Sequence, residues 1–87
     1  MAVIILTHSV EDYDKWKPLY DDDRTRRDEA GLKEVICGQK SDDPKQVYVV
    51  WETDNPDSIQ AMFDDPELKE KMEQAGVTSP PEITIVK

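Results

Sequence analysis

The sequence predicts an α+β domain with the element order strand, helix, strand, strand, helix, strand. The N-terminal run Ala2–Leu6 is apolar at every position, which is typical of a central strand buried on both faces. Two β-rich runs, Leu32–Gln39 and Gln46–Thr53, flank a short turn and predict an antiparallel hairpin. Two segments with helix-capping residues separate these strands. We expect residues 1–87 to form a single domain, because the chain is too short for two.

The first helix is expected from about Glu11 to Ala30, with Ser9 as its N-cap and Gly31 at its end. Its apolar face repeats at intervals of three and four residues and comprises Tyr13, Trp16, Leu19 and Tyr20. Pro18 lies inside this pattern and removes a backbone donor, so a kink near Asp14 is expected. The segment therefore forms either a short first turn followed by a longer piece or one bent helix.

The second half of this helix, residues 21–29, is almost entirely charged. One interpretation places Arg24 or Arg27 at the rim of a pocket, where a guanidinium can bind an anionic ligand. The simpler interpretation is a solvated helix end whose charges pair four residues apart, for example Asp23 with Arg27. The sequence leaves both interpretations open.

The hairpin has two local signals. Gly38 interrupts the second strand and indicates a bulge or a close backbone approach. The polar segment Ser41–Lys45 predicts the connecting turn. The third strand is dense in β-branched and aromatic residues, so the two strands should pair along most of their length.

The second helical region consists of two capped pieces. Asp54 or Asn55 caps the first piece, with Pro56 near its first helical position, and Asp65–Pro66 repeats this signal. The inward-facing residues are Ile59, Met62, Phe63, Leu68 and Met72, and Gly76 ends the second piece. The last strand is expected over residues 82–86, after two consecutive prolines that force an extended chain.

Short connections and right-handed crossovers arrange these elements as a ferredoxin-like βαββαβ domain. Its four-stranded antiparallel sheet has the first and third strands at the centre and the helices on one face. The first strand is nevertheless apolar on both faces, with Val3 and Ile5 on one and Ile4 and Leu6 on the other. An uncovered apolar face favours association with a second copy. We therefore expect a homodimer joined sheet to sheet.

Composition excludes several classes of function. The chain has 20 acidic and 11 basic residues and a net charge of −9, which disfavours a nucleic-acid partner. The run Ala2–Leu6 is far shorter than the ~20 residues of a membrane span and lacks the basic flank of a signal peptide, so a cytoplasmic protein without membrane contact is expected. Cys37 is the single cysteine and His8 the single histidine, so neither an intramolecular disulfide nor a structural zinc site is expected.

Several segments resemble a known superfamily. They are Val49-Val50-Trp51-Glu52-Thr53, the helix with Met62-Phe63, and Asp65-Pro66-Glu67-Leu68, together with the entry His8–Trp16. The chain is similar in these segments to the dimeric α/β-barrel superfamily, in particular to its antibiotic-biosynthesis-monooxygenase-like group and related cyclase-like or uncharacterised small proteins. The resemblance implies two sheets joined into a barrel, with a ligand cleft between the helices and the sheet of each subunit.

The resemblance also implies a range of activities, among them cofactor-independent oxygenation, haem degradation and isomerisation. The oxygenases and haem degraders of the superfamily tend to carry an Asn near the end of the first strand, where this chain has His8. No phosphate loop, dinucleotide fingerprint or metal motif occurs, so we expect no cofactor. Haem is the one cofactor that the resemblance leaves open, with His8 as a ligand.

His8 is the candidate catalytic residue, because it is the one side chain that exchanges protons near neutral pH in an ordinary environment. It can take a proton from a phenol or an acidic carbon, with Tyr48 or Glu52 orienting it if they share its face. The alternative is a structural histidine that caps a strand end or the following helix. Cys37 is expected to be a small buried hydrophobe rather than a nucleophile.

Aromatic and sulfur-containing side chains can form the walls of a pocket for a flat ligand or can simply be core. The candidates are Tyr13, Trp16, Tyr48, Trp51, Met62 and Phe63, with Glu52 and Arg27 as polar binding residues. The leading hypothesis is a homodimeric barrel that binds a small aromatic or polyketide-like ligand and acts as a cofactor-independent monooxygenase, cyclase or isomerase. The alternative is a non-catalytic ligand-binding or stress-related dimeric module.

Overall fold

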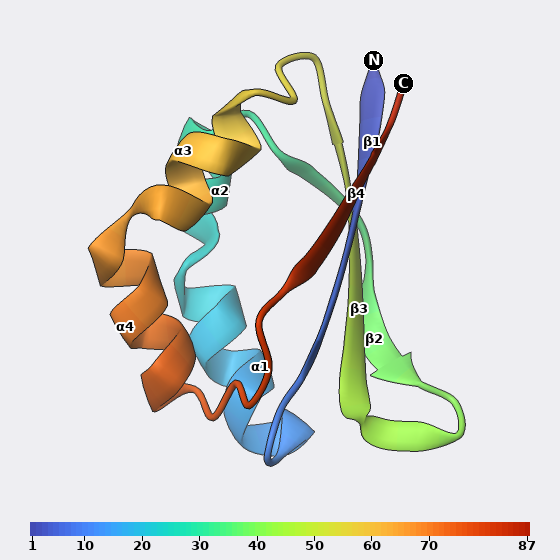
Figure 1. Ribbon diagram of the computed structural model, residues 1–87, viewed down its shortest axis with the longest axis vertical. Coiled ribbons are helices and arrows are strands. Elements are labelled where there is room, and N and C mark those ends of the chain that lie inside the picture. Colours follow the sequence, from blue (N-terminus) through green and yellow to red (C-terminus); the bar gives the residue numbers. More distant parts are fainter.

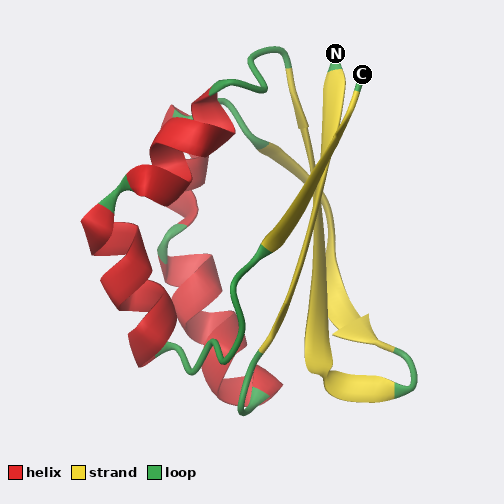
Figure 2. Ribbon diagram, viewed as in Figure 1, coloured by secondary structure: helices red, strands yellow, loops and turns green.

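The computed structural model describes residues 1–87 and has two layers, a four-stranded antiparallel sheet and four helices packed on one of its faces (Figures 1 and 2). The elements are β1 Ala2–Ser9, α1 Tyr13–Asp22, α2 Arg24–Glu29, β2 Lys33–Lys40, β3 Asp43–Thr53, α3 Ser58–Asp64, α4 Pro66–Gln74 and β4 Glu82–Val86. The strand order is β2-β3-β1-β4, with β1 and β3 at the centre. The predicted ferredoxin-like α+β fold is confirmed, each of its two helices being divided into two pieces.

The register of β1 explains the burial pattern. Ile4 lies opposite Trp51 of β3 and Ile85 of β4, and burial alternates along β1 so that every second side chain faces the helices. The face toward the helices carries Ala2, Ile4, Leu6 and His8 from β1 and Val47, Val49, Trp51 and Thr53 from β3, all buried. Because the side-chain period of a strand is two, the intervening residues lie on the opposite face.

The core lies between the two layers and is small, since 16 of the 87 residues are buried. Four aliphatic side chains are almost completely enclosed: Ile4, Val10, Val47 and Val49. Burial of each contributes roughly 1.5–3 kcal/mol to folding. With so few such residues, stability depends strongly on how the remaining apolar surface is covered.

The first helix begins later than the sequence suggested. Asp12, and not Ser9, is the N-cap of α1, and its carboxylate accepts a hydrogen bond from the Asp14 N–H at 3.0 Å. Ser9 instead continues β1 opposite Gln46, and its carbonyl accepts from the Thr78 N–H. The Ser9 hydroxyl donates to the side chain of Gln46. Both oxygen atoms of Ser9 are thus bonded away from the helix, which starts at Tyr13.

The break in the first helical region lies at Asp23 and not near Asp14. Pro18 is accommodated within α1, whereas Asp23 leaves helical geometry with φ −90° and ψ 15°. The Asp23 carboxylate lies between Arg26 and Lys71, 3.1 Å from the Nε of the first and the Nζ of the second. The helix thus bends where a side chain binds α4, which a local sequence pattern does not show.

The hairpin differs in two details from its prediction. Gly38 pairs regularly with Tyr48, and a Cβ at its position would meet no atom within 4 Å, so it marks neither a bulge nor a close approach. The shifts in register lie elsewhere, between Glu34 and Ile36 and between Gln39 and Lys40. β3 begins at Asp43, inside the segment expected to be a turn.

The second helical region follows the prediction at its second piece. Asp65 caps α4 by accepting from the Glu67 N–H at 2.9 Å, with Pro66 as the first helical residue. α3 starts at Ser58 and has no side-chain cap, so neither Asp54 nor Asn55 acts as one. The Ser58 hydroxyl instead donates to the Ala30 carbonyl at 2.7 Å and ties α3 to the end of α2.

Gly31 and Gly76 follow α2 and α4 and have φ values of 75° and 82°, in the left-handed region that glycine adopts without strain. Both predicted helix ends are therefore confirmed. No helix has the length and apolarity that crossing a membrane requires.

The second face of the sheet is bare, with no helix over it (Figure 2). We call it the open face. Its apolar residues are Val3, Ile5, Ile36, Tyr48, Val50 and Val86, placed there by their cross-strand pairing. Ile36 is 58% exposed and Val86 49%, so this surface matches the exposed apolar patch expected from the sequence.

Candidate functional site

A cavity of about 200 Å³ lies between the helices and the covered face of the sheet. Its walls come from β1, β3 and all four helices, so it forms only when the two layers are in place. Apolar and aromatic side chains dominate the lining: Leu6, Trp16, Leu19, Tyr20, Trp51, Met62, Phe63, Leu68, Met72 and Ala75. The polar lining residues are His8, Asp22, Asp23, Arg27, Lys71 and Gln74. A mostly apolar cavity with a few convergent polar groups has the character of a small-molecule site.

His8 lies in the wall of this cavity because the alternation of β1 turns it toward the helices. It is 4% exposed, and its Nδ1 atom is buried without a hydrogen-bond partner. Burial lowers the pKa of His8 below its ordinary value of 6.5, and the nearby Ser9 backbone opposes this in part without reaching hydrogen-bond geometry. His8 is therefore a neutral imidazole at pH 7, able to accept a proton.

An aromatic stack extends from His8 along one wall of the cavity. The ring of Trp16 meets that of His8 edge-on, and Tyr20 stacks on Trp16 with ring centroids 4.8 Å apart and planes inclined by 26°. Trp16 and Tyr20 are four residues apart in α1, a spacing that places them on the same face of the helix. The guanidinium of Arg27 closes the stack, its central carbon 3.7 Å from the centroid of the Tyr20 ring.

The hydroxyl of Tyr20 holds Trp51 in place. It accepts a hydrogen bond from the indole Nε1 of Trp51 at 3.2 Å and donates one to Glu34 at 2.7 Å. Burial, and then the bond to Glu34, raise the pKa of Tyr20 far above its usual value. Tyr20 is therefore a neutral phenol that orients the wall, and it does not act as a base.

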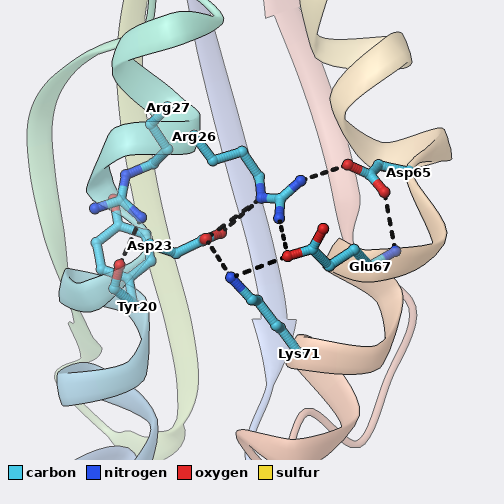
Figure 3. Close-up of polar contacts among 7 residues, drawn as sticks. All are labelled: Tyr20, Asp23, Arg26, Arg27, Asp65, Glu67 and Lys71. Carbon is cyan, nitrogen blue, oxygen red and sulfur yellow. Dashed lines mark hydrogen bonds and ion pairs between the residues drawn. The ribbon is translucent and has the colours of Figure 1, made fainter.

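Arg27 and Arg26 are adjacent in α2 but point in different directions (Figure 3). Arg27 is 8% exposed and donates from Nη1 to the Tyr20 carbonyl at 2.6 Å. It forms no ion pair, so the expected pair of Asp23 with Arg27 is wrong. Asp23 pairs with Arg26 instead, three residues away, because the chain leaves helical geometry at Asp23.

Arg26 is the centre of an ion-pair network between α2 and α4 (Figure 3). It contacts Asp23, Asp65 and Glu67, and Lys71 contacts Asp23 and Glu67. Asp23 and Arg26 are 15% and 17% exposed, so this part of the network is well shielded from water. Because Asp23 and Lys71 also line the cavity, the network holds α2 and α4 together on one side of it.

The structure brings six of the sequence-predicted site residues to this cavity: His8, Trp16, Arg27, Trp51, Met62 and Phe63. It does not bring Tyr48 and Glu52 there. These two alternate with Val49 and Trp51 in β3, so they lie on the open face, on the other side of the sheet from His8. Neither can orient His8 within this chain.

Trp16 lines the cavity, as the aromatic-pocket interpretation expected, whereas Tyr13 packs against the core and is not part of the lining. The sequence interpretation placed Tyr20 on the apolar helix face without counting it as a site residue, and it missed the network around Arg26. The four-residue spacing from Trp16 to Tyr20 was a usable signal for the first. The network offers none, because Arg26 and Asp65 are 39 residues apart in the chain.

No group of three or more His, Cys, Asp or Glu residues is arranged to hold a metal ion. Haem does not fit either. The cavity of about 200 Å³ is smaller than the 300–1,000 Å³ of typical drug-sized sites, and Trp16 packs against the His8 ring that would have to bind the iron. Cys37 is half-buried on β2, and burial raises the pKa of its thiol to about 11, so it is not a nucleophile at neutral pH.

Comparison with known families gives one match, a family model described as a domain of unknown function (DUF3764), over residues 1–79. No curated protein matches the chain.

Among solved structures, a Bordetella bronchiseptica protein provisionally named an antibiotic biosynthesis monooxygenase is similar, with a TM-score of 0.78 and 13% identity over 99% of this chain and 94% of that one. A Nitrosomonas europaea protein with the same provisional name has a TM-score of 0.60 and 17% identity, over 100% of this chain and 97% of that one. An uncharacterised NIPSNAP domain protein from Burkholderia xenovorans has a TM-score of 0.65 and 16% identity, over 100% of this chain and 93% of that one. These similarities establish a shared fold.

Proposed function

The chain belongs to the family of the domain of unknown function DUF3764, and we propose a function for it. It is a homodimeric barrel protein that binds a small flat organic molecule beside His8. His8 accepts a proton from the ligand, either from a phenol or from an acidic carbon. Such a deprotonation is a first step that cofactor-independent oxygenation, cyclisation and isomerisation can share. The observation that carries the proposal is the unpartnered, buried nitrogen of His8 in the wall of an apolar cavity.

A buried nitrogen without a partner is uncommon, because buried polar groups are almost always hydrogen-bonded. Leaving one unsatisfied costs about 1–3 kcal/mol. A purely structural histidine would be expected to use both ring nitrogens in bonds to the protein. His8 makes no side-chain hydrogen bond of that kind, which supports a role toward a ligand.

The dimensions of the cavity restrict the ligand. About 200 Å³ accommodates one or two fused rings rather than a large polycyclic molecule. The aromatic rings of Trp16, Tyr20 and Trp51 favour a flat molecule, since stacked and edge-to-face contacts each add about 0.5–1.5 kcal/mol beyond simple burial. A two-ring ketone or phenol is therefore the model ligand.

The open face supports the dimer. Ile36, Tyr48 and Val86 are all more than a third exposed there, in a domain with few buried residues. A second copy packed on this face removes the patch from water. This burial stabilises the dimer by about 25 cal/mol per Å² of apolar surface. The barrel that results leaves the cavity accessible, because the cavity lies on the other side of the sheet.

The ligand site is tested with 2-tetralone, a two-ring ketone with an acidic carbon. We expect the protein to bind it in calorimetry and to accelerate deuterium exchange at that carbon, followed by NMR in D₂O. His8→Gln should slow the exchange on the order of 100-fold while changing the dissociation constant less than about threefold, as expected for loss of a general base. Ala75→Phe, which fills the cavity, should abolish binding, and Ile36→Phe on the open face should not.

Exchange at the same rate with His8→Gln would remove the catalytic role of His8. Binding without any accelerated exchange would favour the non-catalytic ligand-binding module. Absence of binding by 2-tetralone and other two-ring compounds would overturn the cavity as a ligand site.

The dimer is tested by light scattering on a sizing column. We expect a particle of about twice the 10.0 kDa chain mass. Ile36→Glu, on the open face, should give a monomer, because it would bury a charge at the interface. Leu19→Glu is the matched control and should leave the dimer intact. Leu19 is also an exposed aliphatic residue, 46% exposed, but it lies in the helical layer and not on the open face. A wild-type monomer would refute sheet-to-sheet pairing.

A further inference from the structure

Arg27 is a buried cation without a counterion. It is 8% exposed, yet no carboxylate lies within ion-pair distance of it. Of the other ten basic side chains, five have carboxylate partners, namely Lys17, Arg24, Arg26, Lys40 and Lys71. The five that have none are all exposed to water, so Arg27 is the one basic side chain that is both buried and unpaired. Arginine is rarely this buried without a paired charge. In a chain with 20 acidic residues, the missing partner is not explained by a shortage of carboxylates.

The protein satisfies only part of the bonding capacity of Arg27. One Nη1 bond goes to the Tyr20 carbonyl, and the flat guanidinium lies over the Tyr20 ring. A guanidinium carries five N–H donors in a fixed plane, suited to binding a carboxylate through two parallel bonds. Stacking on Tyr20 fixes that plane (Figure 3). The bond to the Tyr20 carbonyl is the one side-chain hydrogen bond that Arg27 donates, so its other donors are free.

Arg27 also lies in a suitable place to meet a ligand. It lines the same cavity as His8, and the two residues end the aromatic stack formed by Trp16 and Tyr20. A flat ring that packs along this wall thus has His8 toward one end and Arg27 toward the other. The net charge of −9 repels anions from the protein as a whole, so preference for an anion would require a specific cation in the site.

We infer that the cavity selects a one- or two-ring aromatic carboxylate and that Arg27 is the residue that recognises the carboxylate. This inference rests on the proposed ligand site and adds the chemical class of the ligand. Arg27 acts in binding and orientation. It places the apolar body of the ligand along Trp16 and Tyr20, and the opposite edge of the ligand toward His8.

The test uses 2-naphthoate and its neutral isostere 2-naphthamide in calorimetric titrations of the full chain. We expect the wild type to bind the carboxylate about tenfold or more tightly than the amide, the difference typical of a charge-assisted pair. Arg27→Gln should abolish this preference and leave the affinity for the amide unchanged. Arg24→Gln removes the same charge from an exposed site on the same helix and should keep the preference.

Equal or weaker binding of the carboxylate by the wild type would overturn the role of Arg27 while leaving the ligand site intact. Loss of the preference with Arg24→Gln would also overturn it, because general charge would then be responsible. Failure of both compounds to bind would instead refute the ligand site itself. If Arg27→Gln does not fold, the wild-type comparison and Arg27→Lys decide: a lysine variant that keeps the full preference contradicts recognition by a planar fork.

Discussion

The ring of Trp16 lies edge-on to the ring of His8, with the two centroids 5.5 Å apart and the planes inclined by 72°. The contact joins α1 to the end of β1 and excludes water from the imidazole. It is also the start of the stack that continues through Tyr20 to Arg27. The same contact therefore accounts for the neutral state of His8 and for its position in the cavity wall.

The burial of His8 predicts a stability change with pH. The folded pKa is below the unfolded value of about 6.5, so above pH 6.5 both states are neutral and the stabilisation is complete. As the pH falls below 6.5 the unfolded state binds the proton first, and stability is lost at up to about 1.4 kcal/mol per unit. Between pH 7.5 and 5.5 the wild type should lose more stability than His8→Gln, measured by urea unfolding. Parallel pH dependences for the two proteins would contradict this.

The hydroxyl of Tyr20 predicts a specific loss of stability. Tyr20→Phe leaves the Trp51 indole N–H, in a side chain 2% exposed, without its acceptor. The expected cost is about 1–3 kcal/mol in the free energy of unfolding, measured in urea. Tyr13→Phe is the control, because the Tyr13 hydroxyl bonds no other side chain, and it should cost less than about 0.5 kcal/mol. Equal costs would show that the bond to Trp51 is unimportant.

The network around Arg26 predicts that Asp23 matters more than another aspartate on the same segment. Asp23→Asn weakens contacts to both Arg26 and Lys71 in a shielded position and should cost roughly 1–2 kcal/mol. Asp28→Asn breaks only the exposed pair with Arg24, 3.7 Å apart, and should cost less than about 0.5 kcal/mol. Urea unfolding at low and at 1 M KCl checks both, and the difference between the variants should shrink in high salt.

The raised pKa of the Cys37 thiol predicts that it reacts slowly with thiol reagents. With a pKa of about 11, the folded thiol is almost entirely protonated at pH 8, whereas an unfolded thiol of pKa about 8.5 is partly ionised. Its reaction with an aromatic disulfide reagent should be slower in the folded protein on the order of 100-fold, and should speed up about tenfold per pH unit. The single cysteine makes the absorbance change specific, and the same protein in urea is the reference. Comparable rates in both states would contradict the buried thiol.

The elements that could be predicted are those with local causes. The central strand β1, the hairpin, and the Asp65–Pro66 start of α4 depend on nearby residues, and the structure agrees with them. The predicted cap at Ser9 failed because Ser9 extends β1 opposite Gln46 and binds Thr78, far along the chain. The break at Asp23 was missed for a similar reason, since its partner Lys71 is 48 residues away.

The sequence by itself determined the βαββαβ order and the two sets of side chains in β3, because strand alternation depends only on the parity of the residue number. Only the tertiary structure decided that Trp51 faces the cavity while Tyr48 and Glu52 lie on the open face, because the helices can cover either face until they pack. It also decided that Arg27 lies over Tyr20 without a counterion. Burial and partnership are properties of segments brought together in space, and no local pattern contains them.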